Sequence, residues 1–197
     1  MAVTFANIIV GEGNLSVGSN ASTSSALGSV TFYDVGGTQE GVMISWEPDM
    51  VDIEVDQFGD AARVIQSKVK VMVKTTLAEN TFDNLALAWG YGGAAGFGDT
   101  AKTSLQPGVQ SGGTTLNLGI HDPLPEERQI KVVGPAPGTS VTQRKTRTYT
   151  CKRAISFGTV EQGYQRNDNV KLPVEFRILP DASSTGKEYG TIVDANA

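Results

Sequence analysis

Residues 49–64 read DMVDIEVDQFGDAARV, and within them acidic and aliphatic side chains alternate strictly. A period of two is typical of a β-strand, because successive side chains of a strand point to opposite faces. The next run, VIQSKVKVMVKTTL (64–77), alternates as well, and DQFGDAA (56–62) between the two predicts the turn of a hairpin. The acids of the first strand are Asp52, Glu54 and Asp56, and the aliphatic residues expected to pack inward are Val51, Ile53 and Val55.

The charges of the two hairpin strands raise a question of register. If residues 50–56 pair antiparallel with 64–76, parity puts Lys68, Lys70 and Lys74 on the face of the acids, in a mixed-charge ladder. A β-bulge in DQFGDAA would reverse that relation. The sequence leaves both arrangements open.

Further strand patterns occur along the chain, separated by turn signals. One of the turns is predicted at the Pro/Gly segment VGPAPGT (133–139). Pro173 interrupts the strand 170–178, which predicts an edge or a bulge there because proline cannot donate to a ladder. The predicted strands are 30–35, 41–47, 114–119, 128–133, 147–157, 170–178 and 187–194.

One helix is predicted, at NTFDNLALAWG (80–90). Asn80 is the expected N-cap, and Gly90 can end the helix in a left-handed conformation. The expected apolar stripe consists of Phe82, Leu85, Ala86 and Trp89. A helix of about ten residues is marginal in isolation, so we expect it to lie against a sheet.

The predicted fold is mainly β: an antiparallel β-sandwich or barrel flanked by one short helix, with an extended hairpin or loop used in oligomerisation. The 197 residues fit a single domain, 1–197, and the 23 glycines indicate many turns. Residues 1–29 and the Gly-rich loop 91–113 are expected to be flexible until subunits assemble. No apolar run approaches the roughly 18 residues of a membrane span, and MAVTFANIIVGEG does not resemble a signal peptide, so we expect cytoplasmic synthesis without membrane insertion.

The acidic row is a poor match to a metal site. Asp52, Glu54 and Asp56 would be the first, third and fifth positions of a calcium loop, but Gln57 replaces its glycine and Arg63 replaces its closing glutamate. A solvated strand face is the better interpretation. We therefore expect no bound metal.

Catalytic patterns are also missing from the sequence. His121 is the one histidine and Cys151 the one cysteine, and no G-x-S-x-G motif is present. GYGGAAGFG follows a helix instead of opening one, so it does not match a phosphate-binding loop. We expect a protein that is not an enzyme and that carries no cofactor.

Charge is unevenly distributed along the chain. Residues 1–62 contain nine Asp and Glu and no Lys or Arg, whereas the remaining 135 residues contain 16 bases against 12 acids, a net of +4. The segment RKTRTYTCKR (144–153) concentrates the bases around Tyr149. It is interpreted as a wet strand face or the positive partner of an acidic strand on another subunit, with direct nucleic-acid binding as an alternative.

Two regions together resemble the tail tube proteins of long-tailed bacteriophages. They are 44–90, with EPDMVDIEVDQ, a strand ending TTLAEN and a short helix, and 169–194, with a strand ending LPD before a turn. The resemblance implies a structural virion protein that forms hexameric rings, stacked into a hollow conduit for DNA ejection. It also implies assembly in the host cytoplasm, residence in the virion tail, and tape-measure and tail terminator proteins as partners.

The resemblance gives the charged residues expected roles. Asp52, Glu54 and Asp56 would face the channel, because an acidic lumen lets DNA slide without being held. The expected subunit-interface residues are Lys68, Lys70, Lys74, Arg144, Lys145 and Arg147. Phe58 at the hairpin tip is a further interface candidate, and the sequence equally allows it to fold back onto its own domain. Two other functions remain open: the tube of a contractile injection system, such as type VI secretion or a phage-like bacteriocin, and a soluble β-sandwich binding domain.

Overall fold

The computed structural model of the chain describes residues 9, 11–18, 32–54, 61–90, 127–140, 143–164 and 170–196. Val55, Asp56, Phe58, the loop 91–113 and the predicted strand 114–119 lie outside these residues, as do the side chains of Phe82 and Arg144. Within them the prediction of a mainly β fold with one short helix is confirmed.

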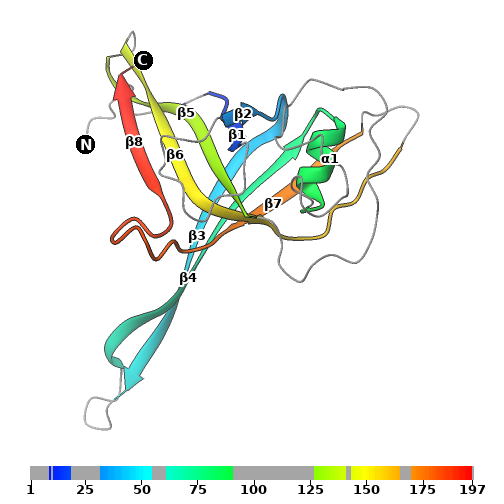
Figure 1. The fold of residues 1–197 in the computed structure, drawn as a ribbon. Helices are drawn as coiled ribbons and strands as arrows, with labels where there is room; N and C mark the ends of the chain where they lie inside the picture. Colours follow the sequence, from blue (N-terminus) through cyan, green and yellow to red (C-terminus); the bar gives the residue numbers. More distant parts are fainter. Residues whose placement is uncertain are drawn as a thin grey trace.

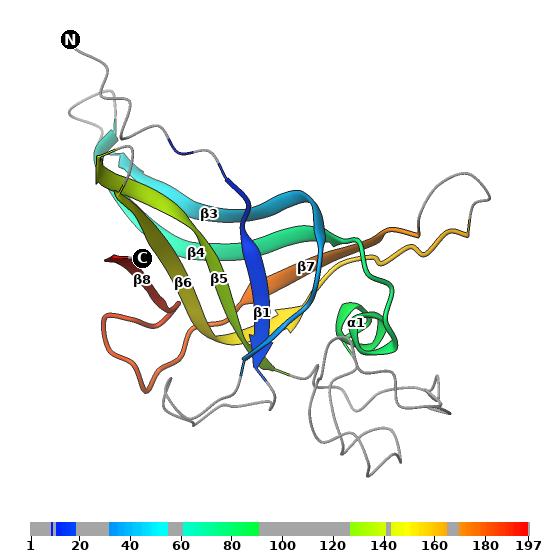
Figure 2. The ribbon, with the colours of Figure 1, turned by 90° about the horizontal axis from the view of Figure 1, so that it is seen from above.

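The strands form one antiparallel sheet in the order β2-β1-β5-β6-β7-β4-β3, with β8 also paired to β6. The sheet curls strongly, so that β1 and β5 face β4 and β7 across the interior (Figure 2). The order ends at β2 and β3, so the sheet is open. The sandwich or closed-barrel part of the prediction is therefore not confirmed. The strands are β1 (Asn14–Gly18), β2 (Phe32–Asp34), β3 (Thr38–Glu54), β4 (Ala61–Leu77), β5 (Arg128–Ser140), β6 (Gln143–Ser156), β7 (Leu172–Ile178) and β8 (Thr191–Asn196).

The core fills the concave side of this sheet. Along β7, alternate residues are buried, as the sequence predicts for Leu172, Val174, Phe176 and Ile178. They meet buried aliphatic side chains of β1, β4 and β5, whose period-two spacing supplies one apolar face per strand. The other main members of this cluster are Leu15, Val17, Val71, Val73, Leu77, Ile130 and Val132.

Two prolines occupy strand positions that have a partner on one side only. The prediction of a turn at VGPAPGT is wrong, because β5 continues through it to Ser140. Pro135 pairs with Thr146 of β6, but β1 pairs with β5 only as far as Val133. Pro173 likewise pairs with Thr76 of β4, beyond the three-residue contact of β7 with β6. The edge predicted for Pro173 is thus confirmed locally, since the missing N–H interrupts no ladder bond on the unpaired side.

The single described helix, α1 (Phe82–Ala88), packs on the core beside β7 (Figure 1). Its N-cap is Thr81 and not Asn80, because the Thr81 hydroxyl accepts a hydrogen bond from the Asn84 N–H at 3.2 Å. Gly90 follows with φ +73°, as predicted for a helix end. Among the helix residues whose burial is described, the most buried apolar ones are Leu87 and Ala88, which the predicted stripe omits.

The predicted hairpin is present and longer than expected. β3 and β4 each span 17 residues, and their paired ends project well beyond the rest of the sheet (Figure 1). No described helix is long and apolar enough to span a membrane.

Candidate subunit interface

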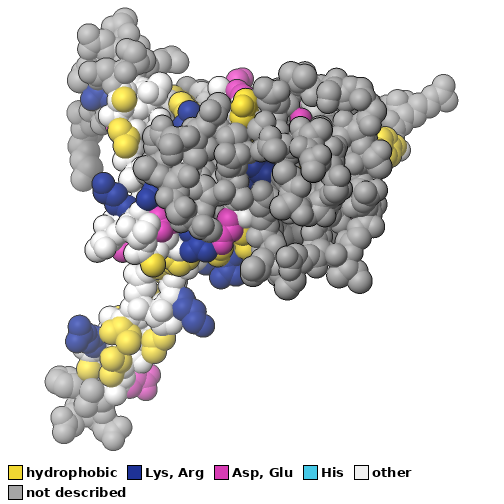
Figure 3. Space-filling model, viewed as in Figure 1, with side chains coloured by type: hydrophobic (Ala, Val, Ile, Leu, Met, Phe, Trp, Pro, Cys, Tyr) yellow, Lys and Arg dark blue, Asp and Glu magenta, His cyan; other side chains and the backbone are white. Residues whose placement is uncertain are grey.

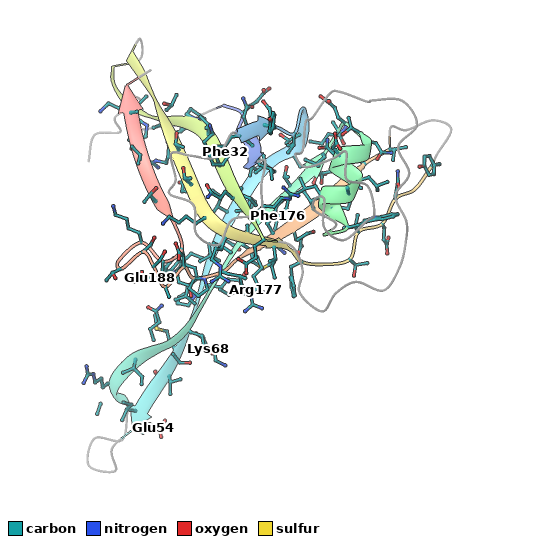
Figure 4. All side chains as sticks on the ribbon, viewed as in Figure 1. Phe32, Glu54, Lys68, Phe176, Arg177 and Glu188 are labelled. Carbon is teal, nitrogen blue, oxygen red and sulfur yellow. The ribbon has the colours of Figure 1, made fainter. Side chains whose placement is uncertain are left out.

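The projecting end of the β3–β4 hairpin consists of residues 48–54 and 61–68 and is called the hairpin arm below. Every residue of the hairpin arm whose burial is described is exposed. In the described part of the chain the arm is a two-stranded ribbon without a third strand, since β4 pairs with β7 only from Val71 onward. In Figure 4, Glu54 lies near its outer end and Lys68 near its base.

A β-bulge at the base of the arm settles the question of register. Asp49 pairs with Lys68, but Met50 pairs with Gln66, so Ser67 has no partner. The extra residue reverses the parity of β4 relative to β3 from that point outward. It lies in β4 outside DQFGDAA. A second register shift occurs within DQFGDAA, where the sequence also allows a bulge: Ile53 pairs with Arg63 and Glu54 with Ala61, so Ala62 has no partner.

The two faces of the hairpin therefore differ in chemistry. On one, the lysine face, Lys70 pairs with Glu47 and Lys68 with Asp49, and farther out Val51 pairs with Ile65 and Ile53 with Arg63. On the other, the acid face, Met50 pairs with Gln66, Asp52 with Val64 and Glu54 with Ala61. Asp52 and Glu54 thus lie opposite apolar residues, and no cross-strand lysine offsets their charge.

Aliphatic side chains are exposed to solvent on both faces of the arm. The expectation that Val51 and Ile53 pack inward is wrong for the single chain, because β3 has left the body of the sheet at this point. Figure 3 shows hydrophobic side chains gathered along the arm, with Lys, Arg and acidic groups beside them. The exposed fractions are 53% for Met50, 44% for Val51, 42% for Ile53, 55% for Val64 and 40% for Ile65.

Most of the predicted interface lysines have an acidic neighbour in the same chain. Lys74 contacts Glu175 at 2.7 Å, and Lys70 lies 3.6 Å from Glu47. Lys68 lies opposite Asp49. These groups are substantially exposed, so the ion pairs contribute little to stability and remain accessible to a partner.

One arginine of the basic segment of β6 has an acidic partner in its own chain. Arg147 donates from Nε and Nη2 to the two carboxylate oxygens of Asp194 on β8, each at 2.7 Å. This fork raises the pKa of Arg147 and lowers the pKa of Asp194. Lys145 pairs in register with Asn196 of β8 and Ala136 of β5. Arg147 therefore holds β8 in its own chain.

A second exposed apolar surface, missed in the sequence, lies on β8. Ile192 is 64% exposed and Val193 is 53% exposed, and they project from opposite faces of the strand. β8 pairs with β6 along one side, and its other side has no strand partner among the described residues. The adjacent apolar residues Ile192 and Val193 are visible in the sequence, but the sequence cannot reveal that the edge of β8 is uncovered.

The described residues contain no group of three or more His, Cys, Asp or Glu placed to hold a metal ion. The sequence matches no known protein-family model and no curated protein. The function must therefore be inferred from the hairpin arm and the strand edges.

Proposed function

We propose that the chain is a structural subunit that assembles with copies of itself, as hexameric rings stacked into the tail tube of a bacteriophage. The observation that carries this proposal is the hairpin arm, with aliphatic side chains exposed on both faces. A two-stranded hairpin is at best marginally stable in water. A ribbon of this kind calls for a partner that covers it.

The energetic case rests on the five aliphatic side chains of the arm. Full burial of such a side chain contributes about 1.5–3 kcal/mol. Because these side chains are 40–55% exposed, completing their burial is worth roughly 1 kcal/mol each. Together with backbone pairing along free strand edges, this is enough to offset part of the cost of association.

The strand edges favour copies of the same chain as partners. In the described part of the sheet, β3 and β8 each have one long side without a strand partner. An edge of this kind accepts another strand by β-augmentation. Two different surfaces that meet each other, repeated from copy to copy, close into rings or extend into tubes. The acidic first third and the basic remainder of the chain supply such unlike surfaces.

The conduit role extends this proposal to DNA. Asp52 and Glu54 lie on the acid face without a cross-strand lysine. Carboxylates that face a channel repel phosphate over about 8 Å at physiological salt and release no counterions, so a duplex passes without being held. Tape-measure and tail terminator proteins are the expected further partners. The tube would belong to the virion tail and be assembled in the host cytoplasm.

Two other functions share part of this support. The tube of a contractile injection system would use the same arm and edges and differ in its cargo. A soluble β-sheet binding domain would instead remain monomeric and leave the arm exposed.

Negative-stain microscopy of the purified full chain at rising concentration tests the proposal. We expect rings or hollow filaments for the wild-type protein. The double variant Ile53→Ser/Ile65→Ser should give dispersed particles and keep the wild-type melting temperature, because both side chains lie outside the core. Tyr164→Ser, which removes a side chain 79% exposed elsewhere, is the matched control and should assemble normally. Dispersed wild-type particles at every concentration would contradict the proposal.

A further inference from the structure

The loop between β7 and β8, residues 179–190, supports the base of the hairpin arm. The Tyr189 ring contacts the Trp46 ring edge to face, with centroids 5.8 Å apart and planes at 77°. The Tyr189 hydroxyl donates to the carbonyl oxygen of Val69 at 3.5 Å. Trp46 belongs to β3 and Val69 to β4, so one side chain touches both strands just before the arm begins.

This loop, called the buttress loop, is held in shape by an internal network around Asp181. The buried Asp181 carboxylate accepts hydrogen bonds from the Ser183 N–H at 3.0 Å and the Ser183 hydroxyl at 2.7 Å. The Ser184 hydroxyl donates to the other oxygen at 3.0 Å. Farther along, the Gly186 N–H donates to the Glu188 carboxylate at 2.8 Å.

The buttress loop is also fixed to the body of the sheet. Lys152 of β6 pairs with Asp181 at 3.1 Å and contacts the Ser184 hydroxyl, and both ionic groups are mostly buried. Arg153 of β6 donates to the Pro180 carbonyl at 2.8 Å while it forks onto Glu127. At the far end, Gly190 has φ +118°, and a Cβ there would clash with the Thr150 backbone. These contacts anchor the buttress loop on β6.

The buttress loop contacts the hairpin close to the point where the hairpin is expected to bend. The bulge at Ser67 lies two residues from Val69 along β4, and a bulge concentrates bend and twist in a ribbon. Without a third element, a two-stranded ribbon would swing about this point. Figure 4 shows the loop, with Glu188 labelled, where it crosses the hairpin above Lys68.

We propose that the buttress loop is a positioning element, in which Tyr189, held through the Asp181–Lys152 pair, sets the angle of the hairpin arm to the sheet. A prealigned arm loses less conformational freedom on docking, so it associates more favourably. The link to docking rests on the proposed assembly with other copies of the chain. The fixed angle itself is a property of the single chain.

Spin-label distance measurements on the dispersed full-length chain test the angle directly. One label goes on Arg63→Cys in the arm and the other on Thr148→Cys in β6, which has a strand partner on each side. Cys151→Ala removes the native thiol. The intact loop should give one narrow distance distribution. Tyr189→Ala and Asp181→Asn should each broaden it and remove its single maximum.

Tyr189→Phe is the conservative control, since it keeps the ring contact with Trp46 and loses only the long hydrogen bond. Tyr189→Phe should show the same narrow distribution and the same assembly as the wild-type protein. A distribution in Tyr189→Ala that matches the wild type would overturn the positioning role. If that variant does not fold, a wild-type distribution in Asp181→Asn has the same consequence.

Assembly of the same unlabelled variants separates the two proposals. We expect Tyr189→Ala to need a higher protein concentration for assembly than Tyr189→Phe. If the arm loosens in Tyr189→Ala while even the wild-type protein never assembles, the positioning role holds and the proposed function fails. If the wild-type protein assembles and the distance distribution is the same with and without the Tyr189 side chain, the positioning role fails and the proposed function stands.

Discussion

Arg147 and Asp194 join β6 to β8 through two parallel hydrogen bonds of 2.7 Å. β8 is a terminal element of the described sheet and pairs there with β6 alone. Because β8 has backbone hydrogen bonds to a single neighbouring strand, the fork adds a second kind of attachment that holds β8 on β6. A planar guanidinium matched to a carboxylate also fixes the register of the pair.

Loss of this fork should loosen β8 and leave the core intact. In Asp194→Asn, we expect faster amide hydrogen exchange in residues 191–195 and unchanged exchange in β7, because β7 is held between β4 and β6. Hydrogen-exchange mass spectrometry measures both in one experiment. The matched control is Glu161→Gln, which removes an exposed acid outside the sheet. If β8 exchanges equally fast in Asp194→Asn and in the control, its backbone hydrogen bonds to β6 are enough to hold it without the fork.

Phe176 should be among the most costly core residues to truncate. It is 1% exposed and lies in the strand between β4 and β6. Phe176→Ala should lower the free energy of unfolding by about 3–5 kcal/mol, through lost burial and the cavity that remains. Urea denaturation measures the loss. Phe157→Ala removes the same group where it is 45% exposed, and a similar loss there would contradict the assignment of the core.

Asp181 should make stability sensitive to acid. Hydrogen bonds from Ser183, with smaller contributions from Lys152 and Ser184, hold the pKa of Asp181 far below its usual range. Arg153 of β6 is a further charged group close to Asp181. A depressed folded-state pKa stabilises the fold at neutral pH, and that stabilisation is lost as pH falls from about 5 toward 1.

The comparison with Asp181→Asn isolates this contribution from those of Glu188 and Asp194, whose pKa values are also lowered. The variant should be less stable at pH 7, and the difference from wild type should shrink as pH falls through the acid range. Urea denaturation at stepped pH values gives the two curves. If the free energies of unfolding of wild type and Asp181→Asn change in parallel with pH, the ionised Asp181 carboxylate does not stabilise the fold.

The thiol of Cys151 should resist chemical labelling in the folded protein. Its side chain packs against the core, and burial raises its pKa to about 11. Few thiolates are then present at pH 8. Ellman's reagent should react slowly with the native chain and fully after denaturation in urea. Rapid reaction of native protein would show that the packing around Cys151 opens readily.

Much of the strand pattern follows from local sequence. The alternation of Leu172, Val174, Phe176 and Ile178 is visible in the chain and matches their burial. The continuation of β5 through Pro135 is not visible, because it depends on where β1 stops pairing. Proline is tolerated in a strand where no neighbouring strand requires its N–H as a hydrogen-bond donor. Which positions meet this condition depends on the pairing in the whole sheet.

The candidate interface was predictable only in part. The alternation of acids and aliphatic residues predicts the hairpin strands, but not that Val51 and Ile53 remain uncovered outside the body of the sheet. The bulge at Ser67, which separates Asp52 and Glu54 from the lysines, follows from pairing and has no clear local signal. The contact of Tyr189 with Trp46 joins residues far apart in sequence, which no periodicity can indicate.

Protection of the arm on assembly tests the central claim most directly. Val64→Cys places a small apolar thiol at a position 55% exposed on the arm. Its reaction with a maleimide should be fast in dilute, dispersed protein and strongly slowed once rings or tubes have formed, because another copy then covers the arm. Equally fast labelling in dispersed and assembled protein would contradict the claim that the hairpin arm is the surface through which copies of this chain join.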